Sequence, residues 1–244
     1  EGLVSRKRGL PSNRKTEEAI REIVEGFIND PLVRGFGPTL MAEKIEQMKD
    51  IRLSKETVRK MMIEAGVWKS KVKKKIEPHY ARPRRKHRGE LVQIDGSEHA
   101  WLEDRGPKAT LLVFVDDATS QMLEAEFVPE ESFFSYGNLC QRYFREHGLP
   151  QAFYSDRFSV FRVNRRDNLR YEPVTQFQRA VSALGIELIC ANSPQAKGRV
   201  ERANQTLQDR LVKEMRLLGI SDYEQANAFL PQFIRAYNRK FAVS

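Results

Sequence analysis

The chain of 244 residues is 40% hydrophobic and 31% charged, with a net charge of +9. This composition excludes an intrinsically disordered chain, and no apolar run approaches the roughly 18 residues of a membrane-spanning helix. Residues 1–90 hold 23 Lys and Arg against 13 Asp and Glu, whereas residues 91–244 hold 19 against 20. A basic segment joined to a near-neutral one indicates binding to a polyanion. Nucleic acid is favoured over a membrane, because the basic third lacks an apolar face with interfacial aromatic residues.

The first third predicts a short basic lead followed by helices. Residues 1–16 are polar and basic, which favours a plain linker over an arm that inserts into a DNA groove. Thr16 is expected to cap a helix over 17–29, which ends at Asp30-Pro31 because the residue before proline disfavours the helical conformation. Helical spacing is carried by the apolar positions Ile20, Ile23, Val24, Phe27 and Ile28.

Two further helices with a short turn between them predict a helix-turn-helix within 17–68. Pro38 and Thr39 open the first, whose apolar positions are Leu40, Met41, Ile45 and Met48. Ser54 is an N-cap signal for the second, which carries Val58, Met61 and Met62 inward and is closed by Gly66. Its outward side chains Lys55, Arg59 and Lys60 are candidate DNA contacts. The alternative is a small helical bundle with solvated lysines.

Residues 69–89 are expected to link two folded units. Lys69–Arg88 contains ten Lys and Arg and one acid, Glu77, while Pro78 and Pro83 exclude a long helix. A solvated linker and an arm that follows DNA phosphates are compatible interpretations. The candidate DNA contacts in this segment are Lys71, Lys73, Lys74, Arg84 and Arg85.

From residue 90 the pattern changes to strands alternating with helices. Strands are predicted at Leu91–Asp95, Leu111–Asp116, Gln121–Val128, Ala152–Ser155 and Ile186–Ala191, and helices at 131–147, Thr175–Leu184 and Val200–Leu218. Three strands followed by alternating helix and strand indicate an α/β fold of the ribonuclease H-like class over 90–220: a mixed five-stranded sheet flanked by helices, preceded by the all-α domain. Residues 221–244 add an amphipathic helix, interrupted near Pro231.

Three acids lie at the ends of these elements. Asp95 ends the first predicted strand, Asp156 ends the fourth, and Glu201 begins the long helix. Strand ends and helix starts meet at one edge of an open α/β sheet, so the three carboxylates are expected to converge. Hard oxygen ligands suit Mg²⁺ or Mn²⁺, and two such ions can promote an in-line displacement at phosphorus. Alternatively, Glu201 only complements the helix dipole. Asp116 and Asp117 are rival ligands.

The loop before the long helix is basic and rich in small residues. It contains Pro194 and Gly198, and its candidate DNA contacts, with those of the following helix, are Asn192, Lys197, Arg199, Arg202 and Gln205. An ordinary polar loop is the alternative. Cys140 and Cys190 lie in apolar runs and are expected to be reduced core residues, and the four histidines have no zinc-finger spacing.

Several motifs together resemble a known family. These are Gln93-Ile-Asp95-Gly-Ser, Phe114-Val-Asp-Asp-Ala-Thr119, Tyr154-Ser-Asp156 and Ala191-Asn-Ser-Pro-Gln-Ala-Lys-Gly-Arg-Val-Glu201-Arg-Ala-Asn. They resemble the catalytic core shared by retroviral integrases and bacterial insertion-sequence transposases, most of all the group labelled ISNCY. Gly37–Trp68 resembles the helix-turn-helix that precedes this core.

This resemblance implies a DDE-type transposase that cleaves and joins DNA strands at the ends of a mobile element. Asp95, Asp156 and Glu201 would bind two Mg²⁺ or Mn²⁺ ions, and no small-molecule cofactor is implied. The expected partners are DNA and further copies of the chain, as a homodimer or larger assembly, in the bacterial cytoplasm at the nucleoid.

Two departures from the family pattern qualify this expectation. The interval from Asp156 to Glu201 is 45 residues, longer than is common in retroviral integrases, and its extra length, Arg157–Thr175, carries five arginines. Such transposases usually begin with another helix-turn-helix and end with a small β-barrel domain. The resemblance therefore implies that residues 1–16 are the remnant of an upstream DNA-binding module and that this chain is a fragment or truncated product. A non-catalytic protein that occupies element ends, and a structure-selective nuclease of the same fold, are the competing functions.

Overall fold

The computed structural model describes residues 16–69, 83–156, 160–161, 174–190 and 198–243. The chain divides into two compact units, residues 1–75 and 76–244. Several sequence-based predictions fall outside the described residues: the lead before Thr16, most of the linker, most of the Arg157–Thr175 insertion, and the candidate contacts Lys71, Lys73, Lys74, Asn192 and Lys197.

The first unit contains three helices. They are α1 (Glu18–Ile28), α2 (Pro38–Lys49) and α3 (Lys55–Glu64), so the three predicted helices are confirmed. The prediction that Thr16 caps α1 is wrong: Glu17 holds the N-cap position, and its side chain makes no capping hydrogen bond. Met48 was expected to be apolar core, but it is 53% exposed near the end of α2.

The α2–α3 connection has the local geometry that the sequence indicates. Asp50 ends α2 in the left-handed conformation, at φ 55°. The Ser54 hydroxyl accepts a hydrogen bond of 3.0 Å from the Thr57 N–H, which confirms the predicted cap of α3. Arg21 of α1 contacts Glu64 of α3 at 2.7 Å, so a surface ion pair joins the first and third helices.

The second unit is built on a five-stranded sheet in the order β3-β2-β1-β4-β5. The strands are β1 (Val92–His99), β2 (Ala109–Asp116), β3 (Met122–Val128), β4 (Ala152–Ser155) and β5 (Glu187–Cys190). β1 pairs antiparallel with β2 and parallel with β4, which confirms the predicted mixed sheet.

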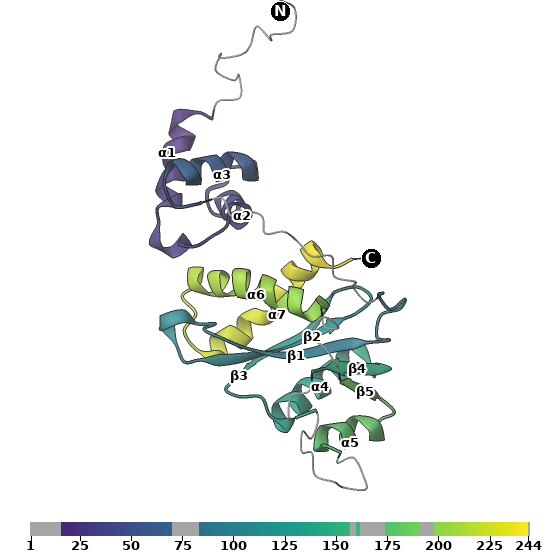
Figure 1. The fold of residues 1–244 in the computed structure, drawn as a ribbon. Coiled ribbons are helices and arrows are strands. Elements are labelled where there is room, and N and C mark those ends of the chain that lie inside the picture. The colour runs from purple at the N-terminus through teal and green to yellow at the C-terminus, as the bar shows by residue number, and fades with distance from the viewer. Residues whose placement is uncertain (1–15, 70–82, 157–159, 162–173, 191–197, 244) are drawn as a thin grey trace, which may run out of the picture. The chain divides into compact units, whose positions relative to one another are not determined.

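Helices cover both faces of this sheet (Figure 1). On one face lie α6 (Gly198–Leu217) and α7 (Tyr223–Phe241), and on the other lie α4 (Phe133–His147) and α5 (Gln176–Ala183). Side chains alternate along β2: Leu111 and Val113 pack in the core with α6 and α7, whereas Leu112 and Phe114 pack with α4 and α5. Two apolar residues of the predicted helices at 131–147 and Val200–Leu218 are not buried, since Phe134 is 77% and Leu218 is 58% exposed.

The C-terminal helix α7 is continuous, so the predicted interruption near Pro231 is wrong. Two asparagines anchor α7 to the edge strand β3, one on each side of the proline. Asn227 exchanges hydrogen bonds with the backbone of Phe127, and Asn238 does so with Met122, at 2.8 to 3.0 Å. These hydrogen bonds pair backbone N–H and carbonyl groups of the edge strand, and they compensate for the backbone hydrogen bond that Pro231 cannot donate within α7. No helix in the described parts of the chain is long and apolar enough to cross a membrane.

Candidate active site

Asp95 and Asp156 lie where β1 and β4 separate. The two strands pair only at Val92 with Phe153 and at Gln93 with Tyr154. Asp95 follows Gln93 by two residues and Asp156 follows Tyr154 by two, so the two acids occupy equivalent steps just beyond the last paired residues. β1 itself does not end at Asp95, as the sequence predicted, because Asp95 still pairs with Val113 of β2 and the strand continues to His99.

Three polar contacts align the first half of α6 along β1. The Val200 N–H donates to Oε1 of Gln93 (3.1 Å), Nδ2 of Asn204 donates to Oδ2 of Asp95 (2.7 Å), and Nε2 of Gln208 donates to Oγ of Ser97 (3.1 Å). Four helical residues rise about 6 Å and two strand residues about 6.6 Å, so the two spacings match. The ladder brings the first turn of α6, and with it Glu201, to the strand that carries Asp95.

The three predicted ligands are half-buried, so each is reachable from solvent. Asp95 lies in β1, Asp156 directly follows β4, and Glu201 is in the first turn of α6. Arg202 and Gln205, on the same helix, are exposed. The structure therefore brings the elements that carry the triad to one place, with an exposed basic and amide side chain beside it.

Glu131 and Tyr136, which the sequence analysis did not select, also belong to this region. The Tyr136 hydroxyl donates to Oε2 of Glu131 at 2.8 Å. The Glu131 carboxylate lies over Gly96, where a Cβ would be only 2.2 Å from its Cδ, so the glycine after Asp95 permits this close approach. The sequence signal that could have indicated this neighbour is Gly96 itself, because a glycine lets another group approach the backbone closely.

Burial and the negative charge of the site both raise the pKa of the Tyr136 phenol. Burial raises the pKa of its phenol well above the ordinary value, and the charges of Glu131, Asp95 and Asp156 raise it further. A negative field at a group of hard oxygen donors fits a divalent cation such as Mg²⁺ or Mn²⁺. The donor chemistry of Asp95, Asp156 and Glu201 therefore suits the ion that their predicted role requires.

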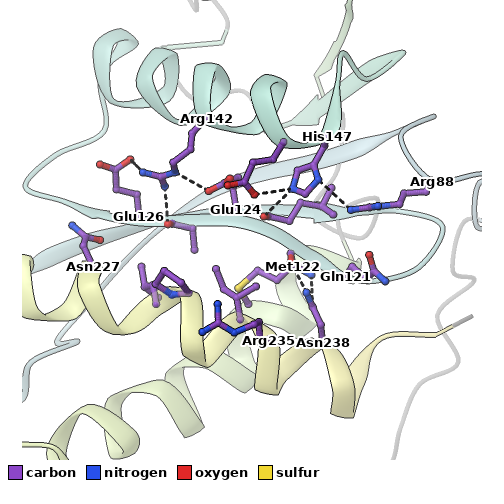
Figure 2. Close-up of a pocket in the computed structure, with 16 residues that line it drawn as sticks. Arg88, Gln121, Met122, Glu124, Glu126, Arg142, His147, Asn227, Arg235 and Asn238 are labelled. Carbon is purple, nitrogen blue, oxygen red and sulfur yellow. Dashed lines mark hydrogen bonds and ion pairs between the residues drawn. The ribbon is translucent and has the colours of Figure 1, made fainter.

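A different group of side chains has its ligand atoms closest together. Among the described residues, Glu124, Glu146 and His147 form a set of three possible metal ligands whose ligand atoms all lie within 4.8 Å of one another. The ligand atoms of Asp95, Asp156 and Glu201 do not meet this criterion. This cluster borders a cavity of about 420 Å³ between β3, α4 and α7. Figure 2 shows Arg142 beside Glu124 and Arg88 beside His147.

Those arginines already supply positive charge to the cluster. Arg142 donates to Glu124 at 2.9 Å, and Arg88 contacts Nδ1 of His147 at 3.2 Å while Nε2 lies 3.3 Å from the Leu123 carbonyl. Burial raises the pKa of Glu124, which Arg142 opposes. A guanidinium competes with a metal ion for the same oxygens, so we assign this cluster a structural role.

Asp116 and Asp117, the rival ligands, are fully buried and hydrogen-bonded within the fold. Asp116 accepts from the Gly89 N–H (2.9 Å) and from the N–H (2.8 Å) and hydroxyl (2.7 Å) of Thr119. Asp117 accepts from Gln93, Arg199 and the Arg85 N–H. Both carboxylates thus hold the β2–β3 turn and the end of the linker.

The described candidate DNA contacts fall into two groups. Lys55, Lys60, Arg202 and Gln205 are exposed. Three arginines are engaged within the protein: Arg59 pairs with Glu56 at 2.6 Å, Arg84 donates to the Ala118 carbonyl at 3.1 Å and to Ser120 Oγ at 2.8 Å, and Arg199 pairs with Asp117 at 2.7 Å. Arg85 uses its backbone N–H, and its side chain is exposed.

The sheet order, the two helical layers and the acids at the β1–β4 separation define a ribonuclease H-like fold of the integrase type. A solved chain in the intasome of simian T-cell lymphotropic virus, in complex with PP2A regulatory subunit B56 gamma, has the same fold. It matches with a TM-score of 0.50 and 15% identity over 76% of this chain and 65% of its own.

In sequence, the chain is similar to transposases of insertion sequences. It is 49% identical over 97% of its length to a protein named as transposase y4bF from Sinorhizobium fredii (strain NBRC 101917 / NGR234). It is 34% identical over 94% of its length to the transposase for insertion sequence IS1202 from Streptococcus pneumoniae. The chain spans about half the length of these relatives, 51% and 43%. No family model matches it. The predicted resemblance to insertion-sequence transposases with an integrase-like core is confirmed.

Proposed function

We propose that the chain is the catalytic portion of a DDE-type transposase, which cleaves DNA strands at the ends of a mobile element and joins them to a target. Asp95, Asp156 and Glu201 are the proposed ligands of two Mg²⁺ or Mn²⁺ ions. The observation that supports this proposal is the shared position of Asp95 and Asp156, each two residues beyond the last β1–β4 pair. The Val200–Gln93 and Asn204–Asp95 bonds, which join α6 to the same strand, support the inclusion of Glu201.

Each residue has a distinct part in this proposal. Ions held by Asp95, Asp156 and Glu201 would supply activation of an attacking oxygen and stabilisation of the leaving oxygen in an in-line displacement at phosphorus. Asp95 is oriented by Asn204, Asp156 extends from the end of β4, and Glu201 comes from the first turn of α6. Arg202 and Gln205, exposed on the same helix, are placed to contact the sugar-phosphate backbone.

The proposed partners follow from the same assignment. DNA is the substrate, with Lys55 and Lys60 of α3 as exposed contacts of the helix-turn-helix. Joining two element ends requires the protein on both, so a homodimer or larger assembly on DNA is proposed, in the bacterial cytoplasm at the nucleoid.

The test compares Asp156→Asn with Asp209→Asn. Asp209 is an exposed acid on α6 that pairs with Lys213, so it matches the charge change outside the site. The substrate is a duplex that carries a terminal sequence of the proposed mobile element, taken from the DNA that flanks the gene. Asp156→Asn should abolish Mg²⁺-dependent nicking while binding to the duplex persists, and Asp209→Asn should retain both. Equal nicking by Asp156→Asn and the unmodified chain would contradict the site. Nicking without strand joining would favour the nuclease alternative.

A further inference from the structure

Asp117 is a buried carboxylate at which three separate segments of the second unit meet. Its side chain is 0% exposed. Oδ1 accepts from Nε2 of Gln93 in β1 and from Nη1 of Arg199 in α6, both at 2.7 Å. Oδ2 accepts from the N–H of Arg85, in the segment that enters the sheet, at 2.8 Å. The carboxylate therefore ties a central strand, the start of α6 and the end of the linker together.

The first turn of α6 has two anchors on this network, and both directly precede Glu201. Arg199 contacts Asp117, and the Val200 N–H donates to Oε1 of Gln93 at 3.1 Å. Gln93 bridges the two, since its amide nitrogen contacts Asp117 while its amide oxygen receives the helix N–H. The helix start is thus tied to this carboxylate twice, directly through Arg199 and indirectly through Gln93.

An arginine at this position needs a specific explanation. The N-terminus of a helix carries partial positive charge, so a cation in the first turn is unfavourable without compensation. The Arg199 side chain is only 13% exposed and faces a fully buried acid. An arginine that served as a phosphate contact would be expected on the surface, as Arg202 is. The geometry instead suits an internal ion pair that fixes one arrangement of the turn.

We propose that the Arg199–Asp117 pair is a positioning device for Glu201, rather than part of the DNA-binding surface. It holds the first turn of α6 against Gln93, so the Glu201 carboxylate is presented beside Asp95. This inference rests on the proposed function, because it assigns Glu201 to the cation site. It adds two positioning residues that act through the helix start and touch neither the ion nor the DNA.

The experiment uses neighbouring arginines of α6 as a matched pair. Arg199→Gln removes the ion pair, Arg199→Lys keeps its charge, and Arg202→Gln changes an exposed arginine three positions away. Glu201→Gln is the reference for the cation site. Three measurements are made on the full chain: Mn²⁺ affinity without DNA, amide hydrogen exchange of residues 199–204, and affinity for a random-sequence duplex as a function of salt. Asp117→Asn tests the partner, with circular dichroism to verify folding.

We expect Arg199→Gln to weaken Mn²⁺ binding by about tenfold or more, the usual effect of losing a residue that orients a ligand. Exchange of the first-turn amides should accelerate by a similar factor, and Arg199→Lys should recover most of both effects. Arg199→Gln should leave the salt dependence of DNA binding unchanged, whereas Arg202→Gln should lower its slope by about one.

The opposite pattern would overturn the inference. If Arg199→Gln lowers the salt slope and leaves Mn²⁺ affinity and amide exchange unchanged, Arg199 is a phosphate contact. If Glu201→Gln has no effect on Mn²⁺ binding, the proposed function loses its ligand. In that case, faster exchange in Arg199→Gln would still show that the pair holds the helix start, and unchanged exchange would refute both. Should Asp117→Asn fail to fold, the two Arg199 variants decide the question.

Discussion

Asn204 of α6 donates a hydrogen bond from Nδ2 to Oδ2 of Asp95 in β1, with 2.7 Å between the two atoms. Asn204 is 8% exposed, and within the described residues its Oδ1 has no hydrogen-bond partner. A buried acceptor without a partner costs free energy of folding. The fold thus tolerates a cost at Asn204 while the same side chain orients a proposed ligand.

Replacing Asn204 should therefore separate stability from activity. Asn204→Leu loses the bond to Asp95 but also removes the unsatisfied oxygen, so the free energy of unfolding should change by less than about 1 kcal/mol. Mg²⁺-dependent nicking should fall by about tenfold or more, because Asp95 loses its orienting donor. Urea unfolding and nicking assays measure the two effects. Gln208→Leu breaks the contact to Ser97 one turn further on, which aligns α6 but does not touch a proposed ligand, so it should lower nicking less than Asn204→Leu does. Equal losses in both variants would contradict the role of Asn204.

Gly96→Ala should disturb the contact between Glu131 and Tyr136. The new Cβ would lie 2.2 Å from Cδ of Glu131, so the carboxylate must move and the buried Tyr136 hydroxyl loses its acceptor. We expect a loss of about 1–3 kcal/mol in the free energy of unfolding. In a Tyr136→Phe background the same glycine change should cost less. A double-mutant cycle by urea unfolding measures this coupling, and additive losses would show that the hydroxyl is not the affected group.

The buried Cys140 thiol of α4 should make the free energy of unfolding of the second unit sensitive to alkaline pH. Burial raises the pKa of the Cys140 thiol from 9.0 to about 12. Because the folded pKa is raised, the protonated thiol stabilises the fold fully below pH 9, and this stability is lost as the pH rises toward 12. The loss attributable to Cys140 approaches about 1.4 kcal/mol per pH unit in that window. Urea unfolding between pH 8 and pH 11 measures it, and Cys140→Ala should show a shallower decline. Parallel pH profiles would exclude the thiol as the source.

Local sequence patterns predicted most elements of this fold. A continuous apolar run, Leu111–Val115, predicted β2, whose buried side chains divide between the two helical layers. Helical spacing predicted α6, which buries Leu207, Leu211 and Met215. Thr175 was placed at the start of its helix, and its hydroxyl accepts from Gln178 at 3.1 Å. These features depend on neighbours within one or two turns, which is why periodicity and capping preferences are informative about them.

The contacts that shape the site could not be predicted in the same way. Arg199 is 82 residues from Asp117, and Asn204 is 109 residues from Asp95, so neither pair has a local signal. A basic loop in the sequence predicted DNA contacts and gave no reason to assign one arginine to a buried acid. Pro231 predicted a break in α7 that the structure does not show. The hydrogen bonds that anchor the helix to the edge strand on both sides of the proline depend on tertiary structure, so the sequence carried no signal for them.

We expect the backbone N–H of Arg85, rather than its side chain, to fix the linker to the second unit. Its N–H donates to Oδ2 of Asp117 at 2.8 Å, and its side chain is exposed. Arg85→Pro removes the donor and the charge, whereas Arg85→Ala removes only the charge. We expect Arg85→Pro to lower the free energy of unfolding by about 1.5–3 kcal/mol, since the acceptor is a buried carboxylate, and Arg85→Ala to change it by less than about 0.5 kcal/mol.

The same two variants separate anchoring from DNA contact. If the exposed guanidinium of Arg85 contacts phosphate, both variants should weaken binding to a random-sequence duplex and lower the salt slope by about one. Only Arg85→Pro should also accelerate amide exchange at the start of α6, because the lost N–H shares Asp117 with Arg199. Similar destabilisation by alanine and proline would mean that the side chain, not the backbone bond, holds the segment. Unchanged exchange in a destabilised Arg85→Pro would mean that the linker and α6 are independent despite sharing one carboxylate.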